Sequence, residues 1–190
     1  MLTFDEVGHV YTLDGVRVPS VTQILRPLSN FDGIPEHVLE AKRDLGQRVH
    51  YACQLDDEDD LDEDSVEEEV EPYLAAWRLF LRESGAKVLL NEHQVAETTY
   101  RFAGTLDNVL ELQSAKWVVD KKTCFTVPPM AGPQTAAYLR ALGDPAVTHR
   151  AAVRLRPDGT YRFDPFSGAD DWSVFLSCLT LHRFKEKHEH

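Results

Sequence analysis

The sequence predicts an α/β fold, more specifically an α+β arrangement in which helices flank a mixed sheet. The first observation is the order of periodic segments, which runs helix, three strands, helix, two strands, helix. The second is the apolar run Trp117-Val118-Val119, which predicts a strand that is buried on both faces at the centre of the sheet. The third is length: because 190 residues suffice for one sizeable core, we expect a single domain over 1–190.

The N-terminal segment, 1–30, is expected to form a β-hairpin and a short helix. The stretches LTFDE, HVYTLDG and VRVPS have the composition of strands, and Asp14-Gly15 provides a turn. Ser20 can cap the short helix VTQIL, which must end before Pro27.

Two longer helices are expected next. Pro35 opens a helix near residues 36–55, and a second helix starts around Pro72 and ends near Gly85. The apolar face of the first helix is expected to comprise Val38, Leu45, Val49 and either Ala52 or Cys53. The second helix shows Tyr73, Trp77 and Leu81 at helical spacing.

An acidic block at 56–71 separates these helices. It contains 12 acidic residues and no basic one, so the rest of the chain has 20 acidic against 20 basic residues although the whole carries −12. We interpret the block as a solvated loop kept open by self-repulsion. Two other interpretations are a gate or DNA mimic beside a basic channel, and an adaptor surface that binds a partner.

The sheet core is expected at 86–165. Strand-like segments at 87–99, 100–112 and 115–123 precede a short helix, 134–142, which Pro133 opens and Gly143 ends. A strand at 149–156 and a Pro-Asp-Gly turn complete the sheet. Asp170 or Asp171 then caps a final helix, whose inward side chains are expected to be Trp172, Phe175, Leu179 and Phe184.

Composition excludes several classes of protein. No apolar run approaches the roughly 20 residues of a membrane span, and the N-terminus does not resemble a signal peptide, so we expect a cytoplasmic protein without a membrane partner. Cys53, Cys124 and Cys178 are scattered without a CxxC pair. This spacing argues against a disulfide framework, a structural zinc or an iron–sulfur cluster, and each cysteine is interpreted as a small core hydrophobe.

Three residues suggest phosphodiester chemistry. Asp120 and Lys122 are two apart on the predicted central strand and therefore share a face, and Asp107 on the preceding strand could pair beside Asp120. Facing carboxylates repel unless a cation lies between them, and oxygen ligands favour Mg²⁺ or Mn²⁺. A neighbouring lysine can orient or deprotonate the attacking water. The alternative, a surface ion pair, is weakened because the surrounding strand is apolar.

Four blocks occur in a fixed order along the chain, and they are Gly46-x-x-x-His50, Gly104-Thr105-Leu106-Asp107, Asp120-Lys121-Lys122 and Gln134-x-x-x-Tyr138. With these blocks the sequence resembles the PD-(D/E)XK nuclease superfamily, in its RecB-type branch close to phage exonucleases. The resemblance covers most of the chain and implies a restriction-endonuclease-like core. Gln54 departs from it, since many members carry an acid there.

The resemblance also implies roles for these residues. His50, Asp107, Asp120 and the Lys121 backbone carbonyl would hold one Mg²⁺ or Mn²⁺, and Lys122 would be catalytic. Gln134 and Tyr138 would reach the scissile phosphate or a base edge, the alternative being a packed tyrosine with its hydroxyl at the surface.

The implied function is a DNA exonuclease in recombination, repair or end processing, of a phage-encoded type. DNA is the expected partner, together with a single-strand annealing or single-strand-binding protein. Alternatives are a structure-selective endonuclease on the same fold and a non-catalytic DNA-binding or scaffold protein that retains it.

Other polar residues are less specific. Glu92 is interpreted as solvent-facing, with a role beside or on the metal as the alternative. Gly46 would permit a close backbone approach. The alternating Arg150, Arg154 and Arg156 suit either phosphate contact or a solvated sheet face, and His182, His188 and His190 are interpreted as surface residues.

Overall fold

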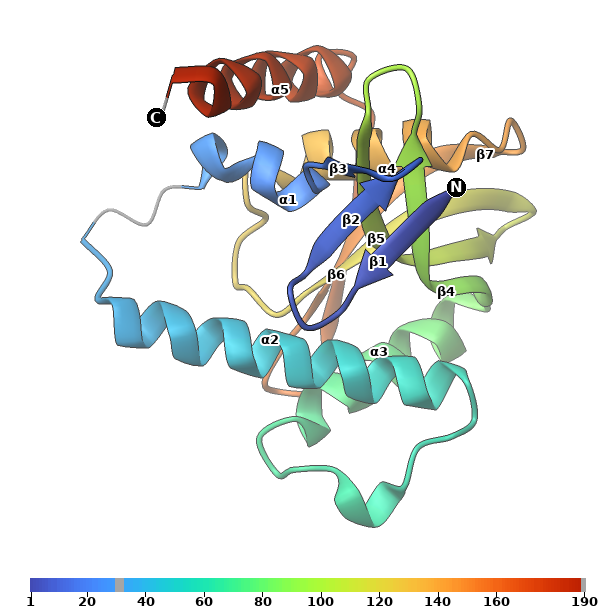
Figure 1. The fold of residues 1–190 in the computed structure, drawn as a ribbon. Coiled ribbons are helices and arrows are strands. Elements are labelled where there is room, and N and C mark those ends of the chain that lie inside the picture. Colours follow the sequence, from blue (N-terminus) through green and yellow to red (C-terminus); the bar gives the residue numbers. More distant parts are fainter. Residues whose placement is uncertain (30–32, 189–190) are drawn as a thin grey trace.

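The computed structural model describes residues 1–29 and 33–188 (Figure 1). Its fold is α+β, with a five-stranded mixed sheet and a separate three-stranded sheet flanked by helices, which confirms the predicted arrangement. None of the helices in the described stretches combines the length and apolar composition that a membrane crossing requires.

The N-terminal sheet is an antiparallel meander of β1 (Leu2–Asp5), β2 (Val10–Leu13) and β3 (Val16–Val18). Helix α1 (Val21–Ile24) follows, and Ser20 caps it as predicted, since the Ser20 hydroxyl accepts from the Gln23 N–H while the Gln23 side chain accepts from the Ser20 N–H. A 3₁₀ turn, η1 (Arg26–Leu28), comes next. Residue 30, the expected end of this segment, lies outside the described residues.

The main sheet has the strand order β4-β5-β6-β7-β8. Its strands are β4 (Lys87–Glu97), β5 (Phe102–Leu112), β6 (Ala115–Lys122), β7 (Val147–Leu155) and β8 (Tyr161–Phe166). Within these five strands, β6 and β7 pair in parallel and the other neighbouring pairs are antiparallel. Helix α4 (Ala131–Leu142) provides the crossover between β6 and β7. Strand β6 is central, as the run of apolar residues on both of its faces predicted.

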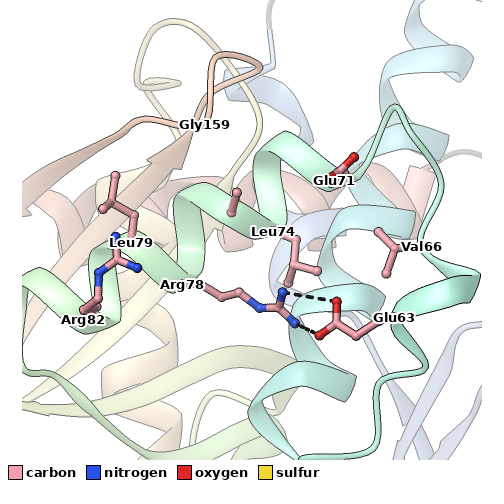
Figure 2. A pocket seen from close by; sticks show the side chains of 9 residues that line it. Glu63, Val66, Glu71, Leu74, Arg78, Leu79, Arg82 and Gly159 are labelled. Atoms are coloured by element: carbon pink, nitrogen blue, oxygen red, sulfur yellow. Dashed lines mark hydrogen bonds and ion pairs between the residues drawn. The ribbon is translucent and has the colours of Figure 1, made fainter.

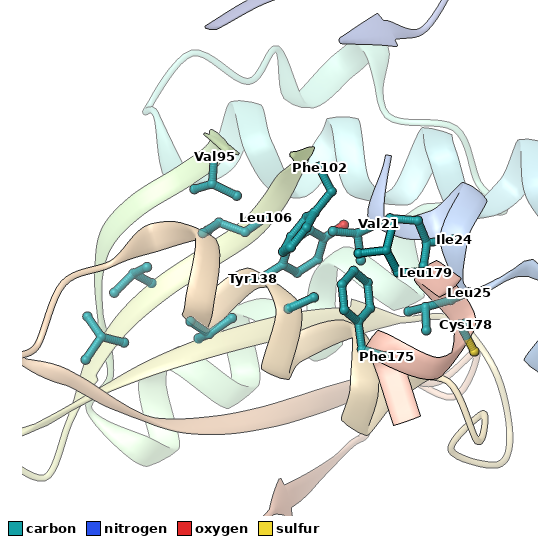
Figure 3. Close-up of a cluster of buried hydrophobic side chains, with 14 residues drawn as sticks. Val21, Ile24, Leu25, Val95, Phe102, Leu106, Tyr138, Phe175, Cys178 and Leu179 are labelled. Carbon is teal, nitrogen blue, oxygen red and sulfur yellow. The ribbon is translucent and has the colours of Figure 1, made fainter. Parts of the chain in front are cut away.

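Each face of the main sheet has its own core. On one face, α1, α4 and helix α5 (Asp171–His188) bury a cluster that includes Val21, Phe102, Tyr138 and Phe175 (Figure 3). On the other face, α2 (Glu36–Asp57) and α3 (Glu71–Ser84) bury a cluster that includes Val49, Trp77 and Val153. Along β6 the two clusters alternate, with Val118 in the first and Val119 in the second.

The acidic block is not the free loop that the sequence suggested. Its first two residues end α2, a 3₁₀ turn η2 (Glu63–Ser65) lies in its middle, and its last residue opens α3. Arg78 of α3 pairs with Asp56 and Glu63, as Figure 2 shows for Glu63, and Arg48 of α2 pairs with Glu67 and Glu69. The two arginines offset the self-repulsion of the block and fold it against the two helices.

Several local predictions are wrong. Helix α4 begins at Ala131, two residues before Pro133, and Phe184 of α5 is 62% exposed instead of inward. Leu39, not foreseen, joins the buried face of α2. Cys53 and Cys178 lie in the two cores, but Cys124 is only half-buried. Burial raises the pKa of Cys53 to about 12, which suits an inert core thiol.

The arginines of β7 do not form a solvated face. Arg150 bonds Asp171 and the Gly132 carbonyl, and thereby ties the start of α5 to the start of α4. Arg154 is buried and paired with Asp164 through two hydrogen bonds. Both guanidinium groups are therefore engaged in structural contacts, which removes the basis for expecting them at phosphates.

Candidate metal centre

The candidate site lies where strands β5 and β6 separate. Their ladder ends at the pair Asn108–Val119, so the next pair in the same register, Asp107 and Asp120, stands just beyond the last paired residues. Past this point β5 no longer pairs with this edge of β6, so the β6 backbone groups that face β5 need another hydrogen-bond partner. The Asp107 carboxylate provides one, because its Oδ2 accepts the Lys121 N–H at 2.6 Å. The register thus brings Asp107 to β6 as the sequence predicted.

Helix α2 reaches the same gap from the other side of the sheet. His50 on α2 places Nε2 3.0 Å from the Lys121 carbonyl oxygen, so this nitrogen donates and Nδ1 is left to accept. His50 Nδ1 lies 3.5 Å from Asp107 Oδ2 and 3.8 Å from Glu92 Oε1. Lys121 therefore contacts Asp107 and His50 through its two backbone groups.

His50, Glu92 and Asp107 form a cluster with the donor set of a metal site. One ligand atom from each residue lies within 4.8 Å of the other two. Burial lowers the pKa of His50, but the charges of Asp107 and Glu92 outweigh this and leave it raised. The cluster thus attracts positive charge, either as a proton on His50 or as a cation.

Glu92 occupies an unusual backbone position. It lies inside β4 with φ of 41°, in the left-handed region that non-glycine residues seldom adopt. Its Oε1 is buried and has no hydrogen-bond partner within the described structure. The solvent-facing interpretation of Glu92 is therefore wrong. Such strain, together with an unsatisfied buried oxygen, is typical of a ligand site.

Asp120 and Lys122 form a second group beside this cluster. Lys122 Nζ lies 2.7 Å from Asp120 Oδ2 and donates to Gln134 Oε1 at 3.1 Å, so β6 and α4 meet at this ammonium group. Burial raises the pKa of Asp120 to about 6 against the opposing effect of Lys122. Burial lowers the pKa of Lys122, but Asp120 and Asp107 outweigh it and leave the value raised.

Tyr138 lies one turn beyond Gln134 on α4 and is buried, which contradicts the alternative of a hydroxyl at the surface. Burial raises its pKa well above the ordinary value, and the charge of Asp107 adds to this. Its ring packs against Gly104, where an added Cβ would come within 2.8 Å of Tyr138 Cε1. Gly104 therefore permits α4 to approach β5 closely at this point.

Two other residues of α2, Gly46 and Gln54, do not contribute side chains to the cluster. At Gly46 an added Cβ would meet only Thr123 Oγ1 at an ordinary 3.6 Å, so close approach does not require glycine there. Gln54 donates to Glu58, and its carbonyl accepts from Asn91. His50 is the residue through which this helix joins the site.

The structure thus brings together most of the predicted site residues. His50, Asp107 and the Lys121 carbonyl meet at one point, while Asp120, Lys122, Gln134 and Tyr138 line its α4 side. Asp120, predicted as a ligand, is engaged by Lys122 instead of belonging to the three-residue cluster. Glu92 takes the third place in the cluster. It lies on β4 between Asn91 and His93, whose partners on β5, Asn108 and Leu106, flank Asp107. Its place as an acidic residue on the first strand of the sheet was the only sequence signal for it.

Behind Lys121, on the α2 face, lies a buried polar group that the sequence did not predict. Lys121 is 0% exposed, and its Nζ lies 3.9 Å from Asp57 Oδ2 and 5.1 Å from the centre of the Trp77 ring. Asp57 also accepts from Trp77 and Asn108. The side chains of Lys121 and Lys122 therefore point to opposite faces of β6, as strand alternation predicted.

Comparison with known proteins gives no independent assignment, because no family model and no curated protein matches the chain.

Proposed function

We propose that the chain is a divalent-metal-dependent DNA nuclease that hydrolyses phosphodiester bonds as an exonuclease in recombination or end processing. The observation that carries the proposal is the junction of two groups at the gap between β5 and β6. One is the His50–Glu92–Asp107 cluster, and the other is the Asp120–Lys122–Gln134 contact. The element order of helix, three antiparallel strands, helix and parallel strand supports a restriction-endonuclease-like core.

The residues present fit a hard divalent cation. Two carboxylates and an imidazole converge, and the buried Glu92 Oε1 has no partner among the described residues. Carboxylate oxygens favour Mg²⁺ or Mn²⁺ over softer metals. His50, Glu92 and Asp107 would hold the ion, with the Lys121 carbonyl and Asp120 beside it. When bound, such an ion stabilises the negative charge that develops on a phosphate under attack and lowers the pKa of water.

The chain's own residues supply the remaining chemistry. Lys122 presents an ammonium group that can orient the attacking water and offset charge on the phosphate. Asp120 and Gln134 fix the position of that group from two sides, at 2.7 and 3.1 Å. Tyr138, buried against Gly104, limits access of bulk water to the same corner. An oriented nucleophile beside a fixed positive charge is the arrangement that phosphodiester hydrolysis needs.

The test combines cleavage with direct metal binding. We expect the protein to degrade end-labelled linear DNA with Mg²⁺ or Mn²⁺, to spare closed circular DNA and to be inactive with EDTA. Cutting of the circle would instead identify an endonuclease. Binding of DNA without cleavage under every condition would contradict the proposal and favour a scaffold protein.

Metal binding is measured by Mn²⁺ titration with electron paramagnetic resonance. Glu92→Gln should weaken Mn²⁺ binding at least about tenfold, because a charged ligand becomes neutral while the side chain keeps its shape. Glu111→Gln, on β5 away from the cluster, is the matched control and should bind like the unaltered protein. Equal affinities in the two variants would place the ion elsewhere.

A further inference from the structure

A second polar feature lies on the α1/α5 side of the molecule, outside the candidate metal centre. It is a cleft between the end of β3, the α1–η1 segment and the C-terminal half of α5. Its charged lining residues are Arg17, Arg26, Lys185, His182 and Glu186. Two stretches distant in sequence, 17–27 and 182–186, thus bring three permanent positive charges to one hollow of a chain whose net charge is −12.

The cations of this cleft differ from many others in the protein. Arg48, Arg78, Arg150 and Arg154 are each paired with a carboxylate. Arg17, Arg26 and Lys185, in contrast, are exposed and have no ion-pair partner among the described residues. Glu186 is the one carboxylate lining the cleft, and it lies 3.3 Å from His182 instead of neutralising an arginine. The free positive charge is therefore available to a ligand.

The polar lining also favours an acceptor-rich ligand. The Gln23 side-chain oxygen is held by the Ser20 N–H at 3.0 Å, so its amide group is left as a donor at the cleft. Arginine, lysine and amide N–H groups are all donors, and two of the three cations are guanidinium groups that can bond phosphate oxygens in pairs.

The cleft is joined to the candidate metal centre through α1. The Pro19 carbonyl at its edge accepts from the Ala103 N–H of β5 at 3.1 Å. One residue further along β5, Gly104 is packed between Val21 of α1 and the Tyr138 ring of α4. Figure 3 shows Val21 and Tyr138 in one cluster with Leu179 of α5. A strand of nucleic acid lying in the cleft would thus be one short helix away from Tyr138.

We propose that this cleft binds backbone phosphates of DNA that extends from the candidate metal centre. The inference rests on the proposed nuclease function, for which it supplies a binding site beyond the reacting phosphate. Phosphate contacts of this kind position the substrate without reading its sequence. They also explain how a chain with net charge −12 can bind a polyanion, since the attraction is local.

The test is a salt titration of binding by fluorescence anisotropy, using a labelled duplex oligonucleotide, the full chain and EDTA to prevent cleavage. The test variant is the triple change Arg17→Ala/Arg26→Ala/Lys185→Ala. The matched control is Arg82→Ala/Lys87→Ala/Arg162→Ala, which removes the same side-chain types and the same charge from exposed positions on α3, β4 and β8. Circular dichroism and thermal unfolding verify that both variants fold.

Each phosphate contact contributes about 0.9 to the slope of log K against log salt concentration on a duplex. The cleft variant should therefore lose roughly 2 to 3 from this slope and bind on the order of a hundredfold more weakly, while the control stays near the unaltered protein. Equal slopes in all three proteins, equal losses in both variants, or no binding by the unaltered chain would overturn the inference.

Cleavage with Mg²⁺ or Mn²⁺ is measured in parallel, so the two proposals can fail separately. Cleavage that is insensitive to the cleft variant would leave the nuclease proposal standing and remove the cleft. DNA binding that depends on the cleft, without any cleavage, would support the cleft and contradict the nuclease proposal.

Discussion

On one face of β6, Lys122 lies 2.7 Å from Asp120 and also bonds Gln134, at the edge of the candidate metal centre. On the other face, Lys121 lies 3.9 Å from Asp57, and its Nζ makes no hydrogen bond within the described structure. Both pairs join adjacent lysines to buried aspartates. They differ in surroundings, because the first borders a gap between strands whereas the second is enclosed by α2, α3 and Trp77.

The comparison shows that residue type alone does not decide a role. Burial raises the pKa of Asp57 as it does that of Asp120, so both carboxyl groups carry a desolvation penalty. On the Lys122 face the lysine side chain is 21% exposed, so water or a ligand can offset part of that penalty. On the Lys121 face the compensation must come from the protein, through the Trp77 and Asn108 hydrogen bonds to Asp57.

The largest expected effect concerns Lys122. Lys122→Ala should lower the single-turnover cleavage rate at saturating DNA by about 10²- to 10⁴-fold, the usual contribution of a group that positions or transfers a proton. Mn²⁺ binding should persist, because His50, Glu92 and Asp107 are untouched.

The other face supplies the control. Lys121→Ala alone is unsuitable, since it leaves Asp57 buried and unpaired. The double variant Asp57→Asn/Lys121→Met removes both charges, keeps an acceptor for Trp77 and retains the Lys121 backbone groups that contact His50 and Asp107. Its rate should stay within about tenfold of the unaltered protein. If it fell as far as that of Lys122→Ala, the two faces would not differ in chemistry.

The next effect is on stability. Lys121→Met or Asp57→Asn alone should lower the free energy of unfolding in urea by about 3–5 kcal/mol, because each leaves an uncompensated group in the core. The double variant should recover to within about 1 kcal/mol, since a buried ion pair contributes little net stability over neutral residues of similar size. Additive losses in the double variant would mean that Lys121 and Asp57 do not interact.

The sequence predicted most of the fold because its local signals agree. The Ser20 cap, the Asp14-Gly15 turn and the apolar run in β6 each correspond to an observed element. The failures occur where tertiary contacts decide. Phe184 has helical spacing, but it lies on α5 beyond the last buried residue of that helix, Leu179, and so remains exposed.

The candidate site divides in the same way. Strand alternation was enough to separate Lys121 from Lys122, and the hairpin register was enough to bring Asp107 to β6. The place of Glu92 depends on a backbone angle that β4 adopts only in the folded protein. Asp57 is one of the 12 acidic residues of the block at 56–71, and its sequence neighbours do not distinguish it from the others. Its burial beside Lys121 was therefore not predictable from the sequence.

The smallest expected effect is a pH dependence on the Lys122 face. Burial raises the pKa of Asp120 from 3.8 to about 6, so the folded metal-free protein retains a proton that the unfolded chain releases within this window. The free energy of unfolding in EDTA should therefore fall as pH rises from 3.8 to about 6, by on the order of 3 kcal/mol in total, and this contribution should stay constant above it.

Asp120→Asn has no titrating group at this position, so its unfolding free energy should not show this fall. As pH rises through that window, the variant should therefore become more stable relative to the unaltered protein. Both proteins are measured by urea unfolding in EDTA at a series of pH values. Saturating Mn²⁺ should oppose the loss in the unaltered protein, because a bound cation favours ionised carboxylates and stabilises the folded state by mass action. Parallel curves for the two proteins would mean that Asp120 is solvated like an ordinary aspartate. The contrast between the two faces of β6 would then rest on Lys121 alone.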